Sequence, residues 1–74
     1  MGRLAGFKYK KVVRKLKKLG LLFEREGKGS HEIWYNPKTD CFTVVPRHSK
    51  SLPEGTLRAV LKEAKIEVDE FLKA

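Results

Sequence analysis

A regular apolar stripe near the start of the chain limits what it can fold into. Between Lys8 and Leu19 the apolar residues recur with helical spacing, and they are Tyr9, Val12, Val13, Leu16 and Leu19. This spacing predicts an amphipathic helix, and Gly20 supplies the left-handed residue that commonly follows a helix end. Lysines and arginines fill the complementary positions. The helix must therefore bury one face and present a strongly positive one.

Three extended runs follow this helix, at residues 21–26, 30–35 and 41–45. Turn residues at 27–29 and 36–40 separate them, which predicts a meander of short antiparallel strands. A second helical stripe, at Leu57, Val60, Leu61 and Ala64, predicts another helix that begins at Glu54 or Gly55, with Thr56 as a candidate N-cap. Near the end of the chain, a last helical turn is expected to return Phe71 to the core.

These elements predict one small α+β domain that spans residues 1–74, with its core at about residues 8–72. Two helices should pack on one face of a three-stranded antiparallel sheet in the order α-β-β-β-α, followed by a short C-terminal helical turn. Double-stranded-RNA-binding domains have this topology. Successive strand residues point to opposite faces of the sheet, and both sets include apolar residues. The sequence therefore leaves open which sheet face the helices cover.

The positive charge is concentrated in one element. Residues 1–20 hold eight basic residues and no acidic one, whereas the rest of the chain holds nine of each sign, so the net charge of +8 arises in the first 20 residues. Such a directed field favours a polyanion, most commonly nucleic acid, over an anionic membrane surface, while a merely solvated face is the alternative. The residues expected to make salt-sensitive phosphate contacts are Lys10, Lys11, Arg14, Lys15, Lys18 and Lys28.

Several classes of site are disfavoured. The single cysteine, Cys41, excludes an intrachain disulfide and is expected to act as a small apolar strand residue, which fits a reducing cytoplasm. No apolar run approaches the ~18 residues that a membrane span requires, so we expect a protein that is soluble and makes no membrane contact. The acidic residues form no clustered pair, which argues against a two-metal nuclease, and no cofactor or metal is expected.

The two histidines are the candidates for chemistry. His31 follows Gly29 and Ser30 where a turn meets a strand, and His48 follows the third strand and Arg47. RNA carries its own nucleophile, the 2′-hydroxyl, so a histidine that moves a proton and nearby cations that stabilise phosphate charge would suffice. The predicted reaction is metal-independent transesterification, which leaves a 2′,3′-cyclic phosphate.

Other interpretations of these residues stay open. His31 could be a structural histidine that packs beside its same-face neighbours, and His48 could be a second proton carrier, a phosphate contact or a loop histidine. Ser30 is more simply a turn hydroxyl than a nucleophile. Trp34 and Tyr35 point to opposite faces of their strand, and one of them could stack on an RNA base or simply cover the sheet.

Four segments in register resemble a known family: residues 16–20 (LKKLG), 27–31 (GKGSH), 45–48 (VPRH) and 52–58 (LPEGTLR). Together they resemble HicA, the mRNA interferase toxin of HicA–HicB toxin–antitoxin systems. The resemblance implies a double-stranded-RNA-binding-like fold and an mRNA endoribonuclease whose catalytic residue is His31. It also implies a HicB antitoxin that covers this site. Family members often carry a histidine or polar residue where Glu32 stands, but strand alternation should point Glu32 away from His31.

Two other functions also fit these sequence features. One is a non-catalytic RNA-binding module that uses the same fold and charge. The other is an interaction module whose basic face holds an acidic protein. Binding of RNA without cleavage would indicate the first, and tight binding of an acidic partner with little affinity for RNA would indicate the second.

Overall fold

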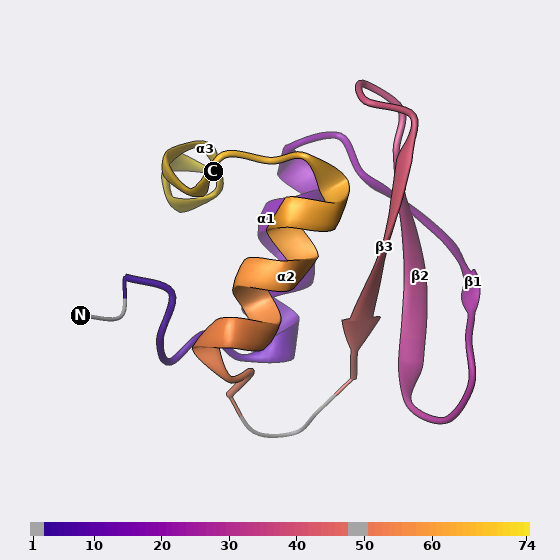
Figure 1. Ribbon diagram of the computed structural model, residues 1–74, viewed down its shortest axis with the longest axis horizontal. Coiled ribbons are helices and arrows are strands. Elements are labelled where there is room, and N and C mark those ends of the chain that lie inside the picture. Colours follow the sequence, from indigo (N-terminus) through magenta and orange to yellow (C-terminus); the bar gives the residue numbers. More distant parts are fainter. Residues whose placement is uncertain (1–2, 48–50) are drawn as a thin grey trace.

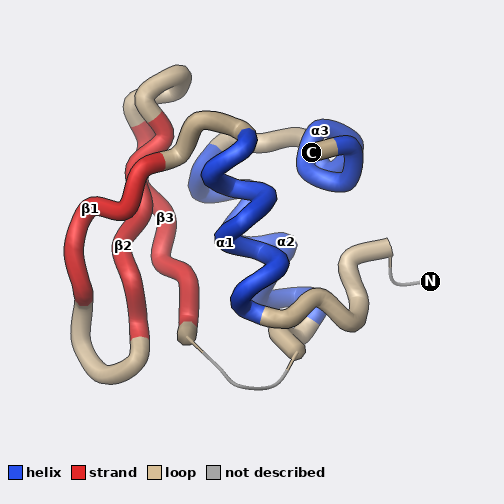
Figure 2. Tube along the Cα trace, turned by 180° about the vertical axis from the view of Figure 1, so that it is seen from behind, coloured by secondary structure: helices blue, strands red, loops and turns tan. Residues whose placement is uncertain are grey.

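The computed structural model describes residues 3–47 and 51–74. Its elements are α1 (Tyr9–Lys18), β1 (Leu22–Glu26), β2 (His31–Asn36), β3 (Cys41–Pro46), α2 (Glu54–Ala64) and α3 (Val68–Lys73). The three strands form one antiparallel sheet in the order β1-β2-β3. Helices α1 and α2 lie on the same side of this sheet, and α3 lies beyond them, away from the strands (Figures 1 and 2). The predicted α+β architecture is confirmed.

The first helix forms as its stripe predicts. Val12 and Leu16 are fully buried, and the flanking stripe residues are half-buried. Gly20 follows the helix with φ +96°, a conformation that glycine adopts without steric cost, and its N–H donates to the carbonyl of Lys17. The sequence pattern therefore set both the position and the end of α1.

Helix α2 begins at Glu54, one of the two predicted starts, but its cap differs from the prediction. Pro53 holds the cap position, so Thr56 is not the N-cap. Proline suits this boundary, since its ring fixes φ near the helical value, here −56°, and its carbonyl accepts the first helical hydrogen bond from Leu57. Thr56 lies inside the first turn.

The two faces of the sheet are chemically different. Along β2, the side chains of Glu32, Trp34 and Asn36 point toward the helices and are buried. His31 and the half-buried Ile33 and Tyr35 alternate with them and point to the other face, which no element covers in the described parts of the chain. The structure thus decides the question that strand alternation left open.

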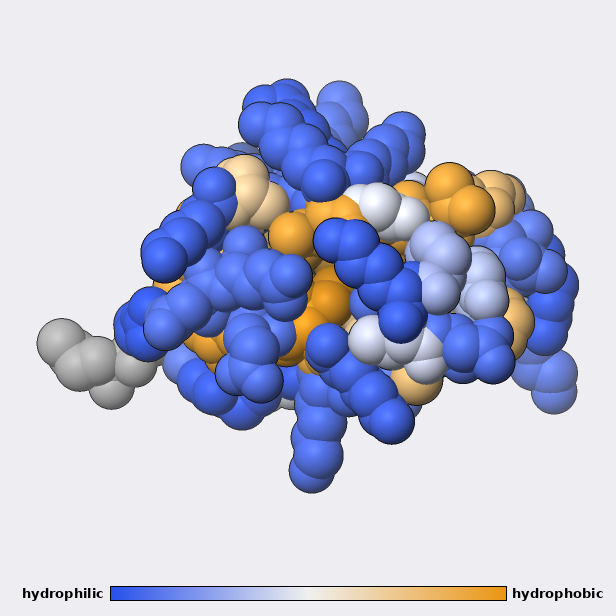
Figure 3. Space-filling model, turned by 90° about the horizontal axis from the view of Figure 1, so that it is seen from above, coloured by the Kyte–Doolittle hydropathy of each residue, from blue (hydrophilic) through white to orange (hydrophobic). Residues whose placement is uncertain are grey.

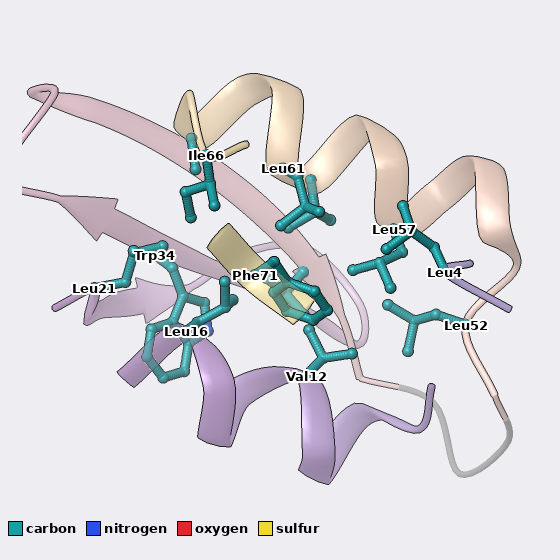
Figure 4. Close-up of a cluster of buried hydrophobic side chains, with 13 residues drawn as sticks. Leu4, Val12, Leu16, Leu21, Trp34, Leu52, Leu57, Leu61, Ile66 and Phe71 are labelled. Carbon is teal, nitrogen blue, oxygen red and sulfur yellow. The ribbon is translucent and has the colours of Figure 1, made fainter. Parts of the chain in front are cut away.

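The core lies between the helices and the covered sheet face (Figure 4). Phe71 of α3 is fully buried among Val12 and Leu16 of α1 and Leu57 and Leu61 of α2, as expected for its return to the core. Two leucines outside the predicted helices and strands are also buried, and these are Leu4 and Leu52. The N–H of Leu52 donates to the carbonyl of Phe7 (2.8 Å), which joins the segment before α2 to the segment before α1.

Candidate active site and the surfaces around it

His31 is the first residue of β2, and its side chain is exposed. The preceding turn uses Gly29 at φ +61°. The N–H of His31 donates to the carbonyl of Lys28 (3.2 Å), and the N–H of Gly27 donates to the carbonyl of His31 (2.9 Å). A tight hairpin therefore fixes the backbone of His31 while solvent reaches its imidazole, an arrangement suited to proton transfer with a large surface-bound substrate.

The second candidate histidine, His48, lies outside the described residues. Its neighbour Arg47 is described, and the backbone N–H of Arg47 donates to the carbonyl of Ser30 (2.6 Å), directly beside His31. The guanidinium of Arg47 lies 3.4 Å from Glu32 and 3.5 Å from Glu26. Arg47 is therefore at the His31 end of the sheet, with its charge engaged by two carboxylates.

Glu32 lies beneath this end of the sheet with a side chain only 7% exposed. Its carboxylate accepts hydrogen bonds from the hydroxyl of Tyr9 (2.7 Å) and the indole Nε1–H of Trp34 (3.0 Å), in addition to its contact with Arg47. The expectation that Glu32 points away from His31 is confirmed. The sequence alone did not predict that Glu32 is a buried hydrogen-bond acceptor. The only signal for it in the sequence is that Glu32 lies two residues before Trp34 and so shares its face of the strand.

Replacing Glu32 with alanine should destabilise the domain by about 1–3 kcal/mol, because the buried Trp34 donor would lose its acceptor. Glutamine at the same position retains one acceptor oxygen and should cost less. Urea unfolding followed by Trp34 fluorescence measures both effects. The matched control is Glu26→Ala, since the Glu26 side chain is 61% exposed and should contribute little. Equal losses at positions 26 and 32 would contradict the role assigned to Glu32.

Tyr9 should make the stability of the domain depend on alkaline pH. Burial, followed by the hydrogen bond to Glu32, raises the pKa of Tyr9 from 10.0 to about 12. The folded state thus keeps a proton that the unfolded chain releases above pH 10.0, so this contribution is complete below pH 10.0 and is lost as pH rises toward about 12. Tyr9→Phe should flatten the fall in unfolding free energy across this interval, relative to the unchanged protein. Parallel curves would show that Tyr9 is not its source.

Most of the predicted phosphate-binding residues are exposed. Lys10, Lys11, Arg14 and Lys18 are exposed on α1, and Lys28 is exposed in the hairpin turn before His31. The hydrogen bond between Tyr9 and Glu32 joins the first turn of α1 to the His31 end of the sheet. Figure 3 shows polar side chains over most of its view. The first turn of α1 thus lies at the His31 end of the sheet, on the covered face, whereas the side chain of His31 points to the open face.

Lys15 differs from the other residues that were expected to contact phosphate. Its side chain is half-buried, and its ammonium donates to the carbonyl oxygens of Leu72 (3.3 Å) and Ala74 (2.8 Å). The same ammonium lies 5.6 Å from the ring centroid of Phe71 and 5.8 Å from that of Phe7. These contacts place a cation at the C-terminal end of α3, where the helix dipole favours it. Lys15 is therefore a packing residue that fastens α3 to α1.

The open face of the sheet is apolar and partly hollow. Its large side chains come from all three strands, and we call these residues the sheet patch: Leu22, Ile33, Tyr35, Phe42 and Val44. The rings of Tyr35 and Phe42 are 4.9 Å apart, whereas Trp34 belongs to the core. A shallow hollow of ≈ 460 Å³ crosses this face, with Arg25 and Glu63 at its sides.

The remaining candidate groups of the sequence add little to the site around His31. Cys41 is a half-buried strand residue whose thiol lies 3.3 Å from the carbonyl of Thr39. Within residues 3–47 and 51–74, no group of three or more His, Cys, Asp or Glu side chains is arranged to hold a metal ion. In the same residues, no helix has both the length and the apolarity to cross a membrane.

Comparison with models of known protein families places the chain in one of them. A family model described as "HicA toxin of bacterial toxin-antitoxin" matches residues 9–66. The match begins at the first residue of α1, extends past the end of α2, and includes His31, Glu32 and Arg47. No curated protein matches the chain.

Proposed function

Because the chain belongs to the HicA family, the toxins of bacterial toxin–antitoxin systems, we propose that it is an endoribonuclease that cleaves mRNA and that a HicB-type antitoxin holds inactive. One observation carries this proposal. His31 is exposed on a tight hairpin within the matched segment, at the end of the sheet to which the first turn of the basic helix α1 is tied through Tyr9 and Glu32. Cytoplasmic RNA is the polyanion that such a toxin would meet.

The proposed chemistry uses the 2′-hydroxyl of the RNA as nucleophile. This oxygen attacks the adjacent phosphorus, its proton passes to a base, and the departing 5′-oxygen takes a proton from an acid. His31 performs one of these proton transfers, and His48 is the candidate for the other. Lys28, which is exposed in the turn before His31, can stabilise the extra phosphate charge. The exposed cations of α1 hold the flanking phosphates.

The end groups of the products test this chemistry. Purified protein should cut a labelled mRNA in excess EDTA and leave a 2′,3′-cyclic phosphate on one fragment and a 5′-hydroxyl on the other. Polynucleotide kinase would then label the new 5′ ends directly, without prior phosphatase treatment. Products with a 5′-phosphate, or cleavage that stops in EDTA, would contradict the mechanism.

A non-catalytic RNA-binding module is the second candidate, and the state of Arg47 favours it. Because Glu26 and Glu32 engage this guanidinium, the cation beside the His31 hairpin is already partly neutralised. A protein of this kind would retain RNA in a gel-shift assay and leave it uncut under every condition that supports binding.

A further inference from the structure

The sheet patch exposes more apolar surface than a free protein of this size needs. Leu22 is 58% exposed, Phe42 is 52% exposed and Val44 is 40% exposed, and all three lie on the open face. Residues of this type are normally buried, and a contiguous exposed group of them marks a contact surface. In Figure 3, apolar atoms reach the surface on the right, the side on which Figure 1 places the sheet.

Carboxylates border the patch at the β2–β3 turn and along its two sides. Asp40 accepts a hydrogen bond from the hydroxyl of Tyr35 (2.7 Å), and together with Glu24 it helps to raise the pKa of Tyr35. Glu63 reaches over the edge of β3, where its carboxylate accepts from the hydroxyl of Thr43 (3.0 Å) and the N–H of Val44 (3.3 Å). Arg25 is the cation at this border. In a chain with net charge +8, this rim is locally acidic.

The acidic rim distinguishes between possible occupants. RNA is disfavoured, since its phosphates would meet three carboxylates, while the cations suited to them lie on α1. A second copy of the chain is also disfavoured, because patch-to-patch contact would bring the two acidic rims together. Addition of a strand to β3 is hindered as well: Glu63 already occupies the outward N–H of Val44, and Pro46 has no N–H to offer.

We propose that the sheet patch is the surface on which the antitoxin docks, through an apolar segment flanked by lysine or arginine. This inference rests on the proposed toxin function and adds where and by what chemistry the partner binds. The patch supplies the apolar centre of the interface, and Glu24, Asp40 and Glu63 attract the basic flanks. The lysine surface of α1 then serves RNA alone.

The size of such an interface explains how docking would block the site. A standard interface buries roughly 800 Å² on each partner, which is a disc of about 16 Å radius. His31 and Tyr35 share β2, and a rise of ~3.3 Å per residue puts them only ~13 Å apart. A partner centred on Tyr35 and Phe42 therefore also covers His31, although most of its affinity comes from residues that take no part in cleavage.

The double variant Phe42→Thr, Val44→Thr tests the proposal, because threonine keeps the preference for strand while removing the apolar surface. Binding of a HicB-type antitoxin, measured by calorimetry, should weaken by about 30-fold or more, as expected for hot-spot residues. RNA affinity and RNA cleavage should not change, and thermal melting confirms the fold. Glu24→Lys should weaken antitoxin binding further and reduce its dependence on salt.

The matched control changes the opposite surface. Lys11→Glu, Lys18→Glu should reduce RNA affinity and lower the slope of log K against log salt by about 1.5, while antitoxin affinity stays the same. The docking proposal is overturned if the Phe42 and Val44 variant binds antitoxin normally, if it loses RNA instead, or if the patch mediates self-association of the unchanged protein. Failure of the RNA cleavage assay alone would remove the nuclease function and leave the docking surface standing.

Discussion

Alanine in place of His31 is expected to lower the rate of RNA cleavage by about 10²–10⁴-fold, the usual contribution of one general acid or base. The imidazole is exposed, and the hydrogen bonds of the His31 hairpin use backbone atoms, so alanine should leave the fold intact. Single-turnover cleavage of labelled mRNA in EDTA gives the rate. A gel-shift titration of the same protein should show nearly unchanged RNA affinity, because the phosphate contacts lie elsewhere.

Val44→Thr is the matched control for this variant, since Val44 is also exposed on the open face but takes no part in the proposed chemistry. It should cut RNA at the normal rate. If the His31 variant cuts equally well, another residue such as His48 performs the chemistry, and His48→Ala becomes the decisive protein. If even the unchanged protein leaves RNA intact while binding it, the non-catalytic module is the better description.

Leu16→Ala should cost about 2–5 kcal/mol of unfolding free energy. Leu16 is fully buried in the core cluster between α1 and the sheet, and alanine would leave a cavity there. A chain of 74 residues has little stability to spare, and even the lower figure should reduce the melting temperature by about 8 °C or more. Thermal and urea unfolding, followed by circular dichroism, measure the change.

The chain offers the same substitution in a different environment. Leu22→Ala removes the same atoms from a side chain that is 58% exposed on the open face, so it creates no cavity and should change stability far less. Similar losses for the two leucines would mean that Leu16 does not occupy the closed core described here.

Together, the two surfaces would let one small domain serve the two proposed partners, RNA and antitoxin. The exposed cations are concentrated on α1, and the exposed apolar residues are concentrated on the opposite side of the sheet. His31 stands at the end of the molecule where the first turn of α1 and the sheet come together. A partner bound to the sheet patch can thus close the proposed site without competing for every phosphate contact.

Local periodicity was enough to predict the elements of this fold. The stripe from Tyr9 to Leu19, the glycine after it and the turn residues between the strands depend on near neighbours, and the structure confirms α1 and the meander. The N-cap of α2 was harder to predict, because both Thr56 and Pro53 are residue types found at helix starts. Only the first helical hydrogen bond, from Leu57 to Pro53, decides between them.

The candidate site was predictable only in part. The exposure of His31 at a hairpin and the opposite direction of Glu32 follow from the turn and from strand alternation. Lys15 could not be distinguished from its neighbours, because its partners are carbonyl groups more than fifty residues away at the end of α3. Glu32 likewise depends on Tyr9 and Arg47, which come from other elements.

The sequence by itself determined the order of helices and strands, the concentration of charge on the first helix and the position of His31, because each depends on residues close together along the chain. Only the tertiary structure decided which face of the sheet the helices cover. Both faces offered apolar side chains, and the packing of α1, α2 and α3 buried Trp34 and left Phe42 exposed. That choice is made by contacts between distant elements, and it places the sheet patch and His31 on one accessible face.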